Sequence, residues 1–197
     1  MKMNDYISAF TDHLAEALAI GKASELKACD AKIQNVLICG LGGSGIGGTI
    51  LNDLVSDKVG VPVSASKDYS IPHFVGKNTL VIASSYSGNT EETLFALKAC
   101  QERGAQIACI SSGGALQKMA QENGYSLITI PGGHPPRAMF AYSFTQLFFM
   151  FNHYGLIDNS FLADFNESIK LLDSEKVSIQ VEAKELAKKM FGTTPVI

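Results

Sequence analysis

The stretch SSYSGNTEET at residues 84–93 is dense in side chains that can hydrogen bond to an anion. Six of its ten residues carry a hydroxyl, and it follows the continuously apolar run TLVIA. A phosphate monoester needs many hydrogen-bond donors and little net charge. Ser85, Ser87 and Thr90 can each donate one O–H, and Gly88 lets the backbone turn. The pattern therefore predicts a phosphate site between a strand and a helix.

The simpler alternative is that these residues only cap the helix. Asn89 or Thr90 could serve as the cap, with Glu92 three residues beyond Asn89. One hydroxyl or amide is enough for a cap, and here several compete. The excess favours an anion site, with Glu91 and Glu92 facing solvent in the first helical turn, where the helix dipole favours acidic groups.

A second candidate anion loop is GLGGSGIGG at residues 40–48, which follows the apolar run VLIC. Glycines let backbone N–H groups approach an anion, the following helix adds its positive end, and Ser44 adds a hydroxyl. The alternative is a tight turn that needs glycine only for geometry. The loop also contains GxGxxG, and Asp68 stands near the end of the second strand, so nucleotide binding stays open.

Short apolar runs alternate with helical patterns along the chain. We expect strands over 36–40, 61–68, 79–85, 105–112 and 126–131. Helices are expected over 3–30, 46–57, 91–104, 115–124, 138–154 and, as one or two helices, 161–191. Continuously apolar strands that alternate with helices indicate a parallel sheet covered on both faces. We predict an α/β fold, a three-layer α/β/α arrangement with a five-stranded parallel, doubly wound sheet, flanked by N- and C-terminal helices.

The expected domain organisation has three parts. Residues 1–34 form an N-terminal helical segment, 35–155 the sheet domain, and 156–197 a helical linker. The last six residues, GTTPVI, look like a loop that enters a new apolar strand. We expect the linker to lead toward a second domain; the alternative is a short terminal strand added to the sheet edge.

Composition narrows the function further. The chain has 197 residues, 46% apolar and 18% charged, which is typical of a globular protein. The net charge of −3 provides no overall basic field for nucleic acid or membrane. Cys39 and Cys109 lie in apolar strands and are expected to be buried free thiols, and no Cys/His spacing indicates a metal site. With no signal peptide pattern and no 20-residue apolar span, we predict a cytoplasmic protein.

Three motifs in this order resemble the SIS (sugar isomerase) domain: GLGGSGIGG, SSYSGNTEET and PGGHPPRAMFAYS at residues 131–143. More narrowly, they are similar to the N-terminal half of the bifunctional phosphoglucose/phosphomannose isomerases. The resemblance is strong over about 35–155. It implies interconversion of aldose and ketose 6-phosphates through an enediolate, a homodimer, and no cofactor.

The resemblance also implies site residues. The sugar phosphate is expected to be held by Gly43, Ser44, Ser85, Ser87 and Thr90. Arg137 is expected to stabilise the enediolate, a role that suits a fixed cation with forked donors. The catalytic base and the ring-opening histidine of the family belong to a second SIS half, the histidine coming from the partner chain.

The chain has four histidines, and one of them lies near the expected site. His134 lies beside the expected site and could contact the substrate; the alternative is a loop histidine without a functional role. His13, His73 and His153 have no constellation of functional residues around them in the sequence. SIS domains also occur as sugar-phosphate sensors in transcription regulators, so a non-catalytic binder or sensor is the alternative function. Which hexose phosphate is preferred cannot be read from this sequence.

Overall fold

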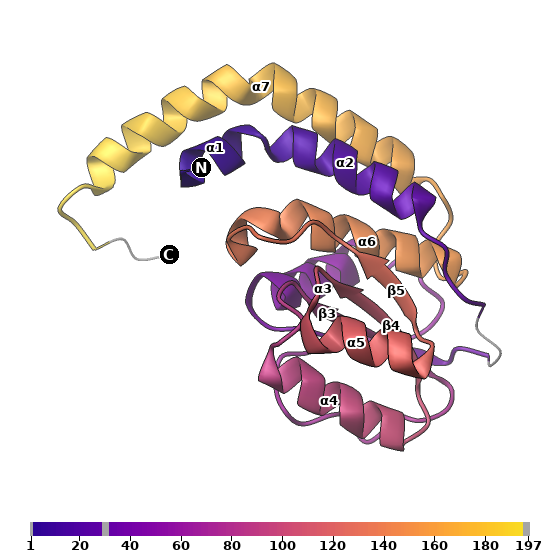
Figure 1. Ribbon diagram of the computed structural model, residues 1–197. Helices are drawn as coiled ribbons and strands as arrows, with labels where there is room; N and C mark the ends of the chain where they lie inside the picture. Colours follow the sequence, from indigo (N-terminus) through magenta and orange to yellow (C-terminus); the bar gives the residue numbers. More distant parts are fainter. Residues whose placement is uncertain (1, 29–31, 195–197) are drawn as a thin grey trace. The chain divides into compact units, whose positions relative to one another are not determined.

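The computed structural model describes residues 2–28 and 32–194. The chain divides into two compact units, residues 1–159 and 160–197. The first contains a five-stranded sheet in the order β2-β1-β3-β4-β5, with every neighbouring pair parallel (Figure 1). The strands are β1 (Asn35–Cys39), β2 (Val63–Ser66), β3 (Thr79–Ser85), β4 (Gln106–Ser111) and β5 (Ser126–Thr129).

Helices cover both faces of the sheet. On one face lie α3 (Gly42–Val55) and α6 (Phe140–His153), which follows the short 3-10 helix η1 (Pro136–Met139). On the other lie α4 (Glu91–Glu102) and α5 (Gly114–Asn123) (Figure 1). The predicted three-layer α/β/α fold with five parallel strands is confirmed.

The central strands are buried on both faces, as their unbroken apolar sequence predicts. All seven residues of β3 are buried. Cys39 and Cys109 belong to the core between the sheet and the helices α4 and α5, together with Cys100. All three are free thiols, as expected for the first two, and burial raises the pKa of Cys109 to about 12. Cys29 lies outside the described residues.

The flanking helices differ from the prediction at their ends. The N-terminal segment forms two helices, α1 (Met3–Ser8) and α2 (Phe10–Ala23), and not one helix to residue 30. Ser24 is already extended, and its side chain bonds back to the carbonyl of Ile20, so the helix ends there. In the second unit, α7 (Phe161–Met190) is one continuous helix of 30 residues.

The end of the chain leaves two predictions untested. Residues 192–194 form no strand, and 195–197 lie outside the described residues, so the expected new strand is not tested. The role of 156–197 as a linker to a second domain also stays a prediction. No helix within the described ranges is long and apolar enough to cross a membrane.

Helix α3 starts four residues earlier than predicted, at Gly42 instead of Ile46. The glycine-rich stretch is therefore mostly helix, and only Gly40 and Leu41 connect it to β1. One of its glycines has a packing role: a Cβ on Gly48 would lie 2.8 Å from Cγ2 of Ile38 on β1. The missing side chain lets the helix rest directly on the strand.

We predict that Gly48→Ala lowers the free energy of unfolding by about 1 kcal/mol or more, because overpacking outweighs the gain in helix propensity. Gly47→Ala is the matched control: its nearest contacts would lie at 3.6 Å or beyond, at ordinary van der Waals distance. That variant should be stabilised by up to about 1 kcal/mol. Urea denaturation of both variants measures the difference, and equal effects would contradict the packing role of Gly48.

Candidate functional site

The candidate site lies where the order of the strands reverses. From β1 the chain continues outward to β2, and from β3 it continues in the opposite direction to β4 and β5. Ligands of open α/β sheets bind in the crevice outside the carboxyl ends of the strands at such a switch point. Both predicted anion segments follow the strands that flank this point, β1 and β3.

A small cavity of about 90 Å³ joins the two segments. Four of the predicted phosphate-binding residues line it: Gly43, Ser44, Ser87 and Thr90. The other lining residues are Leu41, Tyr86, Pro136 and Ser143. Ligand pockets for drug-sized molecules occupy roughly 300–1,000 Å³, so this cavity is large enough for only part of such a ligand.

The other two predicted residues lie next to the cavity and not in its wall. The Ser85 hydroxyl is within 2.8 Å of the Thr90 hydroxyl, and Ser85 is only 2% exposed. The buried Ser85 hydroxyl therefore orients the Thr90 side chain from the interior of the domain. Arg137 follows the lining residue Pro136, is exposed, and forms no ion pair or hydrogen bond with another described residue.

The hydroxyl-rich stretch divides between site and core. Tyr86, Ser87 and Thr90 line the cavity. The hydroxyls of Ser84 and Thr93 are buried without a partner among the described residues, on the strand and on the helix. The sequence argument from an excess of hydroxyls therefore overcounts, because part of the excess belongs to the packed interior.

Helix capping explains little of the stretch. Thr90 is the N-cap of α4 and Leu41 that of α3, yet no side chain caps either helix. Asn89 does cap a helix, but a different one: its Oδ1 accepts the N–H of Ala115 in the first turn of α5 at 3.0 Å. The two helices that begin at the cavity thus keep uncapped N-termini, where the helix dipole favours an anion.

The turn after β3 is held rigidly by the neighbouring segment after β4. Gly88 has a φ of +68°, and a Cβ there would collide with the carbonyl of Gly113. The carbonyl of Tyr86 accepts from both the N–H and the hydroxyl of Ser112, at 3.0 and 2.6 Å. Because this backbone is fixed, Ser87 and Thr90 are held at the cavity before any ligand arrives.

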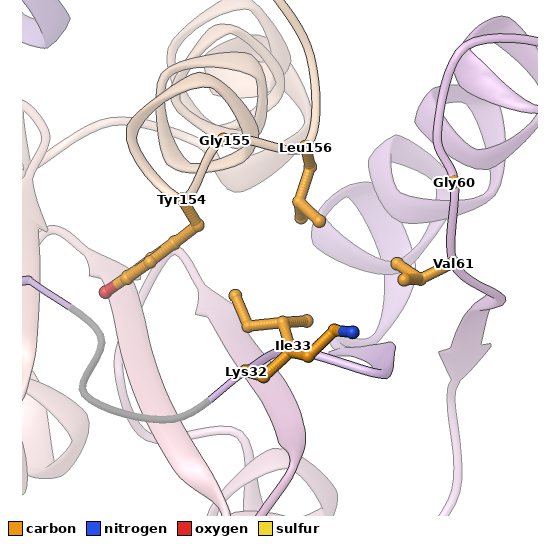
Figure 2. Close-up of a pocket in the computed structure, with 7 residues that line it drawn as sticks. All are labelled: Lys32, Ile33, Gly60, Val61, Tyr154, Gly155 and Leu156. Carbon is orange, nitrogen blue, oxygen red and sulfur yellow. The ribbon is translucent and has the colours of Figure 1, made fainter.

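A second, larger cavity of about 390 Å³ lies at the amino ends of the strands, beside the segments that precede β1 and β2. Figure 2 shows Ile33, Val61 and Leu156 pointing toward one another, with Lys32 beside them. Tyr154 also lines it, but its hydroxyl donates to Ser126. This cavity lies at the amino ends of the strands and not at their carboxyl ends, where ligands of open α/β sheets bind, so it is not the cavity that the predicted phosphate-binding residues share.

Sequence reasoning missed four residues that line the first cavity: Leu41, Tyr86, Pro136 and Ser143. The sequence offered only a weak signal, because all four lie inside the motifs that carry the family resemblance but none was predicted as a site residue. Tyr86 is 9% exposed, and its hydroxyl accepts the backbone N–H of His134 at 3.0 Å. It thereby connects the hydroxyl-rich turn to the segment that carries Arg137.

The fold is a parallel α/β domain with a small cavity at its switch point, and comparison with known proteins adds the family. Residues 31–155, more than half of the chain, match the SIS domain model. The chain therefore belongs to the SIS domain family.

Individual relatives narrow the resemblance. The chain is 40% identical over 193 residues to a bifunctional phosphoglucose/phosphomannose isomerase of Caldicellulosiruptor bescii, over 94% of this chain and 57% of that protein. It is 41% identical over 115 residues to a D-glucosamine-6-phosphate 4-epimerase of Sulfolobus acidocaldarius, over 58% of this chain and 36% of that protein. The chain thus spans little more than half of the curated isomerase that it matches.

A solved structure supports the fold. The C-terminal domain of a glucosamine-fructose-6-phosphate aminotransferase from Francisella tularensis superposes with a TM-score of 0.73 at 15% identity. The match covers 95% of this chain and 59% of that chain. At this identity the likeness concerns the fold alone.

The capping pattern predicts different effects for two neighbouring residues. Asn89→Ala should lower the free energy of unfolding by about 0.5–2 kcal/mol, because α5 loses its side-chain cap. Ser87→Ala should lower it by a few tenths of a kcal/mol at most, because the exposed Ser87 hydroxyl makes one weak bond within the described part of the chain, accepting the N–H of Asn89 at 3.2 Å. Thermal and urea unfolding without ligand test this. A large loss of unfolding free energy in Ser87→Ala would contradict this prediction and would assign that hydroxyl a structural role.

Proposed function

We propose that this chain is the phosphosugar-binding half of a sugar-phosphate isomerase that interconverts glucose 6-phosphate or mannose 6-phosphate with fructose 6-phosphate. The observation that carries the proposal is the cavity at the switch point, where the hydroxyls of Ser44, Ser87 and Thr90 meet two uncapped helix N-termini. This set supplies many hydrogen-bond donors to the oxygens of a phosphate monoester.

The relatives support the substrate class more strongly than the reaction. One is named as an isomerase and the other as an epimerase, at 40% and 41% identity, and both names describe sugar phosphates. Phosphosugar recognition is therefore the element that the two names share. The SIS match also favours a phosphosugar over the nucleotide that the glycine pattern left open.

In the proposed reaction the phosphate occupies the cavity, held by Gly43, Ser44, Ser87 and Thr90, with Ser85 behind Thr90. The sugar carbons lie outside it, near Arg137, because the cavity of about 90 Å³ is small. The guanidinium would stabilise the negative charge that develops on the enediolate oxygens.

Proton transfer requires groups from elsewhere. Moving a proton between C2 and C1 needs a base, and opening the ring needs an acid. The family resemblance assigns these to a second SIS half, with the histidine from a partner chain. The homodimer and the cytoplasmic location also stay predictions. We expect no turnover from these 197 residues alone, because the base and the acid would come from the second SIS half.

The first test is binding of fructose 6-phosphate, followed through the melting temperature. Saturating ligand should raise it by several degrees, because ligand that binds only the native state adds stability by mass action. Ser87→Ala and Thr90→Ala should each weaken binding by about tenfold or more, since each removes a hydrogen bond to a charged group. Free fructose should cause no shift.

Ser56→Ala is the matched control, because this exposed serine lies at the other end of α3 and its hydroxyl bonds, among the described residues, only to the carbonyl of Asp53. It should bind like the unaltered chain. Equal losses in all three serine and threonine variants, or no shift with fructose 6-phosphate at millimolar concentration, would contradict the proposed phosphate site.

The role of Arg137 can be tested with gluconate 6-phosphate, whose C1 carboxylate carries negative charge near the position of the enediolate. The unaltered chain should bind it more tightly than fructose 6-phosphate. Arg137→Gln should abolish this preference and leave the affinity for fructose 6-phosphate within a few-fold, whereas Arg137→Lys should keep part of it, because lysine keeps the charge but loses the forked donors. Calorimetric titration provides the affinities. If Arg137→Gln still prefers gluconate 6-phosphate to the same extent, Arg137 does not lie near the reacting carbons and the proposed role is wrong.

A further inference from the structure

His134 stands at the edge of the cavity, fixed there through its backbone. Its N–H donates to the hydroxyl of Tyr86, a cavity-lining residue, at 3.0 Å. Two residues further along, Pro136 also lines the cavity, and Arg137 follows. The backbone of His134 is therefore part of the same exposed segment that would face the sugar.

The imidazole of His134 is fixed by a residue from the other end of the sequence. Its Nδ1 lies 3.1 Å from the hydroxyl of Tyr6, and the two rings meet edge to face with centroids 5.7 Å apart. Tyr6 is 8% exposed and is the buried residue of the short helix α1. With Nδ1 occupied, Nε2 is the ring nitrogen that remains for a ligand, and a fixed first nitrogen is how proteins orient a working imidazole.

Tyr6 is itself held in place by packing. His13 on α2 lies between Tyr6 and Tyr142, with ring centroids 6.4 and 5.3 Å away. The Tyr142 hydroxyl donates to Glu16 at 2.6 Å, and burial, followed by this carboxylate, raises the pKa of Tyr142, which keeps it a donor. His13 acts here through ring packing, because its buried Nδ1 has no hydrogen-bond partner among the described residues.

The free groups of the segment suit a sugar. The cavity has room for a phosphate and little more, so the hydroxyls of a hexose would lie outside, beside residues 134–137. His134 is exposed, and among the described residues its side chain bonds only to Tyr6. An imidazole N–H or lone pair matches a sugar hydroxyl, which both donates and accepts.

We propose that His134 binds a hydroxyl of the sugar through Nε2 and that Tyr6 is its positioning residue. The inference rests on the proposed function and goes beyond it, because it assigns recognition of the sugar, as distinct from the phosphate, to a residue fixed by the N-terminal helix. It also gives residues 1–34 a role in the site.

The experiment compares two probes, fructose 6-phosphate and inorganic phosphate, by calorimetric titration of the full 197-residue chain. His134→Ala and His134→Asn should weaken fructose 6-phosphate binding by about 3- to 10-fold, the value of one neutral hydrogen bond, and leave phosphate binding unchanged. His134→Gln, whose amide nitrogen can reach the position of Nε2, should retain part of the affinity. Ser87→Ala should weaken both probes alike.

Tyr6 is tested by a double-mutant cycle. Tyr6→Phe keeps the packed ring and removes only the hydroxyl, so it should weaken fructose 6-phosphate by about 2- to 3-fold in the unaltered chain and not at all when His134 is alanine. A purely structural role would lower the melting temperature without changing the ratio of the two affinities.

The outcomes separate the two proposals. If the unaltered chain binds fructose 6-phosphate and His134→Ala leaves the ratio to phosphate unchanged, this inference is wrong and the proposed function stands. If the unaltered chain binds neither probe, both are wrong. A parallel loss of both probes in a His134→Ala variant with an unchanged circular dichroism spectrum would also overturn the inference, because it would assign His134 to the phosphate.

Discussion

The reversal of strand order between β1 and β3 is the constraint on which the rest of the site depends. β1 is followed by α3 on one face of the sheet, and β3 is followed by α4 on the opposite face. Both helices begin at the carboxyl ends of these strands, so their N-termini converge on one crevice. No single loop could create this convergence. It requires two strands that are neighbours in the sheet but more than 40 residues apart in the chain.

Given that geometry, the proposed anion site needs no positive net charge on the chain. The chain is acidic overall, and the cavity contains hydroxyls and helix ends in place of lysine or arginine. Glu91 and Glu92 lie in the first turn of α4, but neither lines the cavity. The helix dipole favours them there, and the lining of the cavity itself contains no carboxylate.

The N-terminal helices belong to the same compact unit as the sheet, and their contacts reach the site. Tyr6 and His134 are separated by 128 residues and lie within hydrogen-bond distance. His13, Tyr142 and Glu16 support this contact from α2 and α6. Helices that appear in the sequence only as a flanking segment thus help to shape the surface beside the cavity.

The sequence by itself determined the five strands, the α/β class, and the two segments that meet at the switch point, because apolar runs and their spacing are local patterns. It placed the start of α3 four residues late, since glycine is a weak helix former and the helix is stabilised there by tertiary packing, including that of Gly48 on Ile38. Tertiary structure alone decided which hydroxyls face the cavity, that Asn89 caps α5, and that Tyr6 holds His134. These are contacts between residues far apart in the chain, and local propensity carries no information about them.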